Sequence, residues 1–258
     1  MADQVSAAVD FRGSGRMLGW AAFFAMILGG WALCWQMVRG DGSWVCGPGQ
    51  IAALPLAGFG ALLAMWTAMT AAMMLPTVLP FLSSYQKLPR AAGAGQAGWF
   101  GFIGGYALIW VGAAAGFAAL QSAVLATGTE TLTAFLASPW YAAALLTVAG
   151  MWQFSRPKIV CQSGCLAPVT YFAGRFRPGA SGGVVMGTEI GLICIGCCWA
   201  LMALAMAGGM NSLVWMGLAT AFMVAEKLPE IGMRLRRPAG MAMLAAACWI
   251  AAQAAGLR

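Results

Sequence analysis

The stretch SGGVVMGTEIGLICIGCCWALMALAMA, residues 181–207, contains a single charged residue, Glu189. About 20 apolar residues in a helix are enough to cross the hydrocarbon core of a bilayer. Similar apolar runs recur along the chain, and they lack the two-residue alternation of barrel strands. Because lipid offers no hydrogen-bonding partner to the backbone, we expect these runs to be transmembrane helices.

The composition of the whole chain agrees with this interpretation. Of its 258 residues, 62% are hydrophobic and 8% are charged, whereas a soluble domain has roughly 25% charged residues. A chain of this size cannot hide so much apolar surface in its own core. We therefore predict an all-α fold, a polytopic transmembrane helix bundle that forms a single domain over residues 1–258. The predicted spans are roughly 17–38, 52–82, 97–126, 131–154, 181–207, 210–228 and 239–257.

The basic residues predict the orientation of these seven spans. If the N-terminus is cytoplasmic, 12 of the 14 Lys and Arg residues fall on the cytoplasmic side, as the positive-inside rule requires. This segregation needs a tight break at Gly208-Gly209, because one helix over 181–228 would be longer than any bilayer is thick. The net charge of +7 is therefore explained by the membrane, and we expect no nucleic-acid partner.

The chain contains no histidine, but it has 8 cysteines and 18 methionines. Histidine is the usual ligand for zinc, haem and Cu(II) and the usual acid–base catalyst at neutral pH. Phosphate loops, nucleophile elbows and Asp-rich clusters are also absent from the sequence, so an enzymatic function is not favoured. Thiolates and thioethers are soft donors that select Cu(I), which makes Cu(I) the candidate cofactor.

The fifth predicted span carries the sharper of two sulfur patterns. Cys194, Cys198 and Met202 recur at a spacing of four residues, with Cys197 on the same face of the helix. The pattern predicts metal ligands. The alternative is simple packing, since a free cysteine behaves as a small hydrophobic residue.

The second predicted span carries the other pattern. Met69 and Met73 are one helical turn apart, and Met74 follows directly. Pro76 and Pro80 interrupt the backbone hydrogen bonding nearby and can leave carbonyl groups facing a cavity. If the two patterns face each other, they form a sulfur-rich site inside the membrane. Most methionines in such a chain are expected to be core filler.

Charged residues inside the apolar runs are the next candidates. A carboxylate in hydrocarbon costs a few kcal/mol, so it is expected to be functional or paired. Glu189 is a candidate ligand, and its possible partners are Lys227 or an arginine of the cytoplasmic loops. For Glu226, which is near the predicted interface, an ion pair is the expected state.

The cytoplasmic connection 155–180 contains Cys161 and Cys165. Their spacing differs from the CxxC pattern of redox and zinc motifs, and the cytoplasm keeps thiols reduced. The pair could pass a soft ion to or from the membrane site.

These motifs resemble a bacterial family described as predicted metal-binding integral membrane proteins of unknown function. The similarity runs through the cysteine loop and the Glu226-Lys227 pair and covers roughly residues 60–230. The most specific pieces are MWTAMTAAMMLPTVLP (65–80), GYALIW (105–110), GLICIGCCWALM (191–202) and GGMNSLVWM (208–216). The resemblance implies metal binding and a multi-pass location in the bacterial inner membrane.

We therefore expect a protein that delivers Cu(I) to a copper-dependent membrane enzyme or serves as its accessory subunit. Its expected partners are the lipid bilayer and another membrane protein. Two alternatives remain open at this point: a thiol-redox membrane protein that uses Cys161 and Cys165, and a structural subunit of a larger membrane complex. The predicted metal ligands are Cys194, Cys197, Cys198, Met69, Met73, Met74, Met202, Glu189, Cys161 and Cys165.

Overall fold

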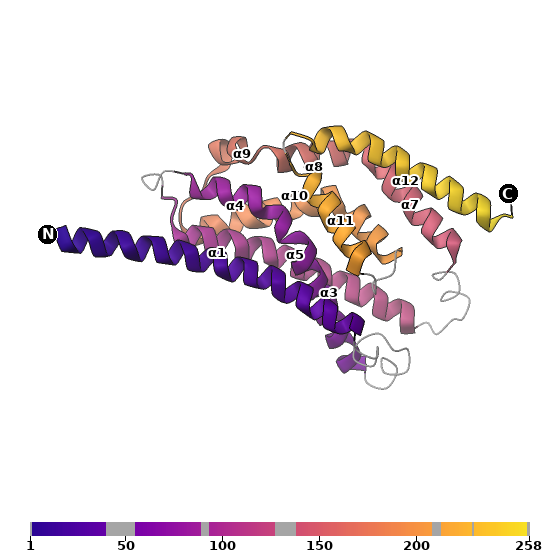
Figure 1. Ribbon diagram of the computed structural model, residues 1–258, viewed down its shortest axis with the longest axis horizontal. Coiled ribbons are helices and arrows are strands. Elements are labelled where there is room, and N and C mark those ends of the chain that lie inside the picture. Colours follow the sequence, from indigo (N-terminus) through magenta and orange to yellow (C-terminus); the bar gives the residue numbers. More distant parts are fainter. Residues whose placement is uncertain are drawn as a thin grey trace.

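The computed structural model describes residues 2–39, 55–88, 93–126, 138–207, 213–228 and 230–256, which lie in helices or in the short connections between them (Figure 1). The predicted all-α fold is thus confirmed for this part of the chain. The helices are α1 (Ala2–Arg39), α3 (Pro55–Met74), the 3₁₀ turn η1 (Pro76–Val78), α4 (Leu79–Gln86), α5 (Gln96–Ala126), α7 (Pro139–Phe154), α8 (Arg156–Leu166), α9 (Pro168–Arg175), α10 (Gly179–Ala207), α11 (Leu213–Ala225) and α12 (Gly232–Ala254).

Four stretches of the described helices are long and apolar enough to cross a membrane. They lie within the predicted spans or extend them by a few residues, and they are Met17–Met37, Gly58–Gln86, Gln96–Val124 and Gly179–Leu204. The apolar helix α11 is shorter than these. Two other predicted spans correspond to α7 and α12, which are not among these four stretches. The described part of α7 has only 16 residues, and the first two turns of α12 contain Arg234, Arg236 and Arg237.

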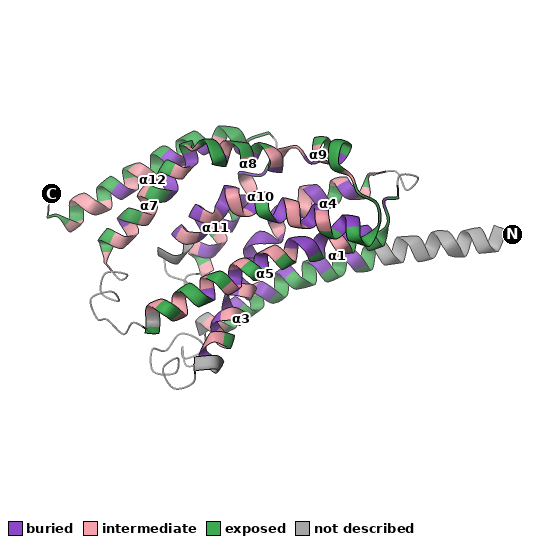
Figure 2. Cartoon of the chain, turned by 180° about the vertical axis from the view of Figure 1, so that it is seen from behind, coloured by how far each residue is buried: buried purple, intermediate pink, exposed green. Residues whose placement is uncertain are grey.

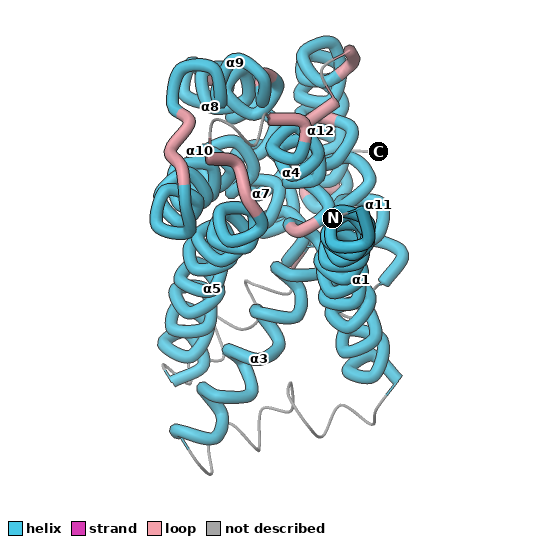
Figure 3. The backbone as a smooth tube through the Cα atoms, turned by 90° about the vertical axis from the view of Figure 1, so that its left-hand side faces the viewer, coloured by secondary structure: helices cyan, strands magenta, loops and turns pink. Residues whose placement is uncertain are grey.

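Helices α5 and α10 form the closest pair in the bundle, because glycines let their backbones touch. A Cβ atom added at Gly105 would meet the carbonyl oxygen of Val184, and one added at Gly187 would meet that of Phe102. Small residues at such contacts are the usual means of helix association in lipid. Helices α1 and α3 pack beside this pair, and α7 packs against α12 on the other side (Figures 1 and 3).

Burial follows the same arrangement. The faces turned towards the centre of the bundle are buried, while the outer faces of α1, α5 and α12 are exposed (Figure 2). Many of the exposed residues are large and apolar, such as Leu28, Leu108 and Trp249. An apolar outer surface of this kind suits contact with lipid rather than water.

The second predicted span is not one continuous helix. Helix α3 ends at Met74, and the chain passes through η1 before α4 begins at Leu79. Because the amide of Val78 bonds to the Leu75 carbonyl, the Met74 carbonyl accepts from the hydroxyls of Thr77 and Tyr106 instead, at 2.7 and 3.0 Å. The Met74 carbonyl is therefore released from the helix, but two hydroxyl groups occupy it; that this segment presents carbonyls to a cavity stays a prediction.

The connection 155–180, which the sequence suggests is a loop, forms the two helices α8 and α9. Ser155 caps α8 by accepting a hydrogen bond from the Lys158 amide. Pro157 and Pro168 occupy the first turns of the two helices, where the missing N–H costs nothing. The short break between them at Ala167 lets α8 lie along α10 while α9 reaches α4 (Figure 1).

The predicted break at Gly208-Gly209 lies outside the described residues. The helices on either side of it, α10 and α11, contact each other. The amino group of Lys227, just after α11, contacts Cys194 in the second half of α10. The described parts of this segment are thus two helices, α10 and α11, and the seven-span topology stays a prediction.

The close contact between α5 and α10 predicts that Gly187→Ala destabilises the protein. The new methyl group meets the Phe102 carbonyl and must push the helices apart, and overpacking of this kind costs about 1–3 kcal/mol. The measurement is thermal unfolding in detergent. Gly112→Ala is the matched control, because no atom lies within 4 Å of its added Cβ, and it should be neutral or stabilising. Equal melting temperatures for wild type and Gly187→Ala would contradict the packing described here.

Candidate metal centre

Three cysteines of α10 form the centre of the site. Cys194, Cys197 and Cys198 are buried, and their sulfur atoms all lie within 4.8 Å of one another. The helical spacing places the three side chains on one face, as predicted. The thiols of Cys197 and Cys198 also contact the Cys194 carbonyl, at 3.2 and 2.9 Å, which fixes their direction.

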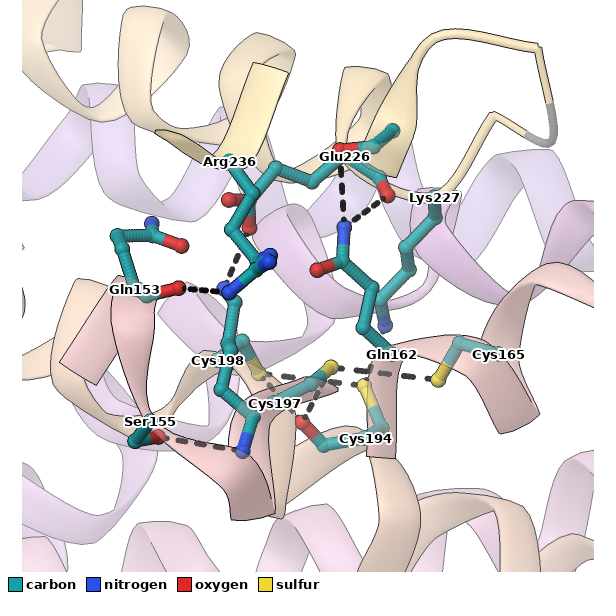
Figure 4. Close-up of polar contacts among 12 residues, drawn as sticks. Gln153, Ser155, Gln162, Cys165, Cys194, Cys197, Cys198, Glu226, Lys227 and Arg236 are labelled. Atoms are coloured by element: carbon teal, nitrogen blue, oxygen red, sulfur yellow. Dashed lines mark hydrogen bonds and ion pairs between the residues drawn. The ribbon is translucent and has the colours of Figure 1, made fainter. Parts of the chain in front are cut away.

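Two further sulfur atoms complete the cluster from other helices. Cys165 at the end of α8 has its sulfur 4.0 Å from that of Cys197, and the thioether of Met74 lies 3.8 Å from the Cys198 sulfur. Cys194 and Cys198 are themselves 4.0 Å apart. We call these five residues, Cys165, Cys194, Cys197, Cys198 and Met74, the sulfur cluster (Figure 4 shows its four cysteines).

A polar network lies against one edge of the sulfur cluster. The ammonium group of Lys227 is 2.6 Å from the Cys194 sulfur and 3.0 Å from the Thr77 hydroxyl. The phenol of Tyr106 lies 3.2 Å from the same sulfur and 3.1 Å from Thr77. Cys194 therefore contacts the polar side chains of Lys227 and Tyr106, whereas Cys198 contacts the thioether of Met74 and a backbone carbonyl.

Helix α8 is held beside the cluster by a buried ion pair and two hydrogen bonds. Lys158 forms an ion pair with Glu226 at 2.7 Å, and both side chains are at most 5% exposed. The Gln162 amide donates to the carbonyls of Glu226 and Gly232 at 2.9 and 3.1 Å (Figure 4). The expectation of an ion pair at Glu226 is confirmed, and its partner comes from the segment interpreted as a loop.

Cys161 lies one helical turn before Cys165 and is half-buried. Its sulfur rests against Gly196, where an added Cβ would approach it to 2.7 Å. Burial, and then the neighbouring Cys197, raise the pKa of the Cys161 thiol above its ordinary value. Cys161 is therefore a partly accessible thiol beside the buried cluster.

Glu189 is not one of the residues gathered at the cluster. Its carboxylate accepts a hydrogen bond from the Tyr171 hydroxyl at 2.8 Å and faces Arg175 and Arg177 at 3.6 and 3.8 Å. Burial and this hydrogen bond raise the pKa of Tyr171. Of the two kinds of partner expected for Glu189, the loop arginines are correct and Lys227 is wrong.

The predicted methionines are also divided by the structure. Met69, Met73 and Met202 are all buried in the same core as the cysteines. Among the contacts described, it is the thioether of Met74 that lies against a cysteine, Cys198. Met74 is the last residue of α3, and its thioether contacts Cys198 of α10.

Several residues of the site were not predicted from the sequence. Thr77, Tyr106, Lys158 and Gln162 have no sequence spacing that links them to the cysteines. One signal was available, since Lys158 and Gln162 are four residues apart and share a helix face that also belongs to Cys161 and Cys165. That face becomes apparent only when residues 156–166 are assigned to a helix.

The donor set suits a soft ion. Two sulfur atoms that each lie ~2.3 Å from a shared ion are at most ~4.6 Å apart, and the neighbouring pairs here are 3.8–4.0 Å apart. The cluster could therefore hold an ion with little movement of the backbone. Thiolates and a thioether in an apolar environment are the ligands that Cu(I) prefers.

Comparison with known proteins adds an independent finding. The family described as "PpoB2: Copper chaperone" matches residues 63–250, which include the whole sulfur cluster. No curated protein and no solved structure matches the chain. This match confirms that the family which the sequence resembles is related to metals. On this match over most of its length, the chain belongs to the PpoB2 copper chaperone family.

Proposed function

We propose that this protein is an integral membrane chaperone that holds Cu(I) in the sulfur cluster and delivers it to a copper-dependent membrane enzyme. The observation that carries the proposal is the meeting of five sulfur donors from α3, α8 and α10 within contact distance. Packing alone does not require three cysteines of one helix to meet a fourth cysteine and a methionine from elsewhere in the chain.

The cluster contains more sulfur donors than one Cu(I) ion needs, and this suits transfer. A chaperone must bind its ion tightly and still release it, so an exchange of one ligand for another is preferable to complete dissociation. Met74 supplies a neutral thioether beside the thiol of Cys198, which in turn lies beside that of Cys194. The ion can therefore move between ligand sets inside the site.

Cys161 and Cys165 give the ion a path between the surface and the cluster. Cys161 is half-buried, Cys165 is buried one turn further along α8, and Cys165 contacts Cys197. Each step along this path exchanges one thiol for a neighbouring one. This supports the hypothesis that the pair passes a soft ion to or from the membrane site.

The proposed setting is the bacterial inner membrane, with seven spans and a cytoplasmic N-terminus. Four stretches with the length and composition of spans support it, and so does the segregation of basic residues in the sequence. In this orientation α8 and α9 lie at the cytoplasmic side, so the path through Cys161 opens to the cytoplasm. The receiving enzyme is proposed to be a membrane protein that docks beside the apolar outer helices.

We expect the purified wild-type protein to bind Cu(I), and Cys194→Ser with Cys198→Ser to weaken this binding by at least ~100-fold. Loss of outer-shell partners alone costs 10–100-fold in metal affinity, and these substitutions remove ligands. The measurement is a competition titration with a chromophoric Cu(I) chelator in detergent. Cys248→Ser is the control, because Cys248 is an exposed thiol on α12, and it should bind as wild type does. The proposal is wrong if the wild type binds no Cu(I), or if the double variant keeps the wild-type affinity.

We also expect Cys161 to react with a membrane-impermeant maleimide only from the cytoplasmic side. Inside-out vesicles should give the labelled peptide and right-side-out vesicles should not, with mass spectrometry identifying the site. Gln253→Cys, at an exposed position near the end of α12, should show the opposite pattern if seven spans separate the two ends. Labelling of both positions from one side would exclude the proposed topology.

A further inference from the structure

A cavity of about 690 Å³ lies between α1, α3 and α5, and the copper-handling proposal gives it no role. Helices α1 and α5 stand on either side of α3 (Figure 3), and residues of all three helices line the cavity. Small residues leave the space open, among them Gly29, Gly60, Ala64 and Ala107. Cavities of about 300–1,000 Å³ are the size of those that enclose small-molecule ligands.

The cavity extends from the lipid-facing surface to the metal centre. Met26 of α1 and Val111 of α5 line it and are 45% and 44% exposed. Met74 also lines it, but this residue is buried and its thioether contacts Cys198 of the sulfur cluster. A molecule that enters from the bilayer would therefore lie against the wall of the sulfur cluster.

The lining of the cavity selects a neutral occupant. In the described part of the chain, no charged residue lines it, and an unpaired charge is far more costly to bury than a neutral group. Two of its hydroxyl groups already donate hydrogen bonds to backbone carbonyls. Thr70 donates to the Thr67 carbonyl and Tyr106 donates to the Met74 carbonyl, both at 3.0 Å.

Trp110 supplies an unpaired hydrogen-bond donor to this lining. The residue lies in α5, one helical turn beyond Tyr106, and is 4% exposed. Its indole nitrogen has no hydrogen-bonding partner among the residues that the structure describes. A buried N–H group normally has a partner, and leaving it unpaired costs free energy. The expected occupant therefore carries a hydrogen-bond acceptor.

The depth of Trp110 restricts which acceptor can reach it. Trp110 is at the midpoint of the apolar stretch Gln96–Val124, 14 residues from either end. A phospholipid carries its ester carbonyls at the edge of the hydrocarbon core, about 15 Å from the bilayer centre, so its acyl chains could fill the cavity but leave Trp110 unpaired. The carbonyls of a partner's transmembrane helix are bonded within that helix. The acceptor is thus expected on a small molecule that lies within the hydrocarbon.

We propose that the cavity binds a neutral, lipid-soluble carbonyl compound of the quinone class, with Trp110 donating a hydrogen bond to one of its carbonyl oxygens. A quinone combines uncharged carbonyls on a flat ring with an apolar tail, which can extend into the bilayer between α1 and α5. The rings of Tyr106 and Trp110, with centroids 6.4 Å apart, form an aromatic wall against which the quinone ring can pack. The proposal does not depend on copper binding, because the ligand and the residue that recognises it are different.

The test uses the full-length protein in phosphatidylcholine nanodiscs, with an azido derivative of a decyl-substituted benzoquinone as the photoreactive probe. Mass spectrometry should locate the adduct on residues that line the cavity. Unlabelled decylquinone should displace the probe at a lower concentration than decylbenzene, which lacks the carbonyl groups. Trp110→Phe keeps an aromatic ring but removes the donor. It should raise the half-maximal concentration of decylquinone about 2–10-fold, the usual contribution of one hydrogen bond, and leave that of decylbenzene unchanged.

The chain offers a matched control for each substitution. Trp99→Phe changes another tryptophan of α5 that is 4% exposed and has no described partner, but this residue does not line the cavity, so binding should stay at the wild-type level. Ala107→Leu fills the cavity one turn from Trp110 and should abolish labelling. Ala119→Leu makes the same change at an exposed position of α5 and should not. If Ala107→Leu fails to fold, Trp110→Phe still gives the readout.

Three results would overturn the proposal. They are the absence of adducts on the cavity lining, equal competition by decylquinone and decylbenzene, and an unchanged decylquinone concentration in Trp110→Phe. Equal competition would mean that acyl chains of lipid fill the cavity without recognition of a carbonyl group. A wild-type protein that binds Cu(I) but not the probe leaves the copper-handling function intact, and one that binds the probe but no Cu(I) overturns that function alone.

Discussion

The sulfur cluster depends on a buried ion pair that contains no sulfur. Lys158 of α8 and Glu226 at the end of α11 meet at 2.7 Å, and this contact joins segments 68 residues apart. It holds α8 against α10, which brings Cys165 to Cys197, and it fixes the turn from which Lys227 reaches Cys194. Removing one member of a buried pair typically costs 3–5 kcal/mol, because the other charge is left unpaired. Of two adjacent residues, Glu226 thus binds α8 and Lys227 contacts the sulfur cluster.

The end of α3 is the second element on which the site depends. A continuous helix through residue 82 would bond the Met74 carbonyl within its own backbone. The interruption at Pro76 instead leaves that carbonyl to Thr77 and Tyr106, the two residues that also contact Cys194 or its partner Lys227. The same interruption places the Met74 thioether 3.8 Å from Cys198. A local break in one helix therefore connects the sulfur cluster to its polar edge.

Features that depend on neighbouring residues could be predicted from the sequence. Helices follow from long apolar runs, and the grouping of Cys194, Cys197 and Cys198 follows from their helical spacing. The identity of the contacting methionine could not be predicted, because it depends on where α3 ends and how far it is rotated. The Lys158–Glu226 pair and the role of α8 depend on contacts between distant segments, which no local pattern encodes. The ion pair and α8 were not predicted because residues 155–180 were interpreted as a loop. The low hydropathy of this segment is typical of both loops and short surface helices.

The central claim is that sulfur atoms alone bind the ion, and X-ray absorption at the copper edge tests it most directly. The wild-type protein loaded with Cu(I) should show two or three sulfur neighbours at ~2.3 Å, with no shell of nitrogen or oxygen. A spectrum that requires nitrogen or oxygen ligands, such as the Lys227 amine or a carboxylate, would contradict the account.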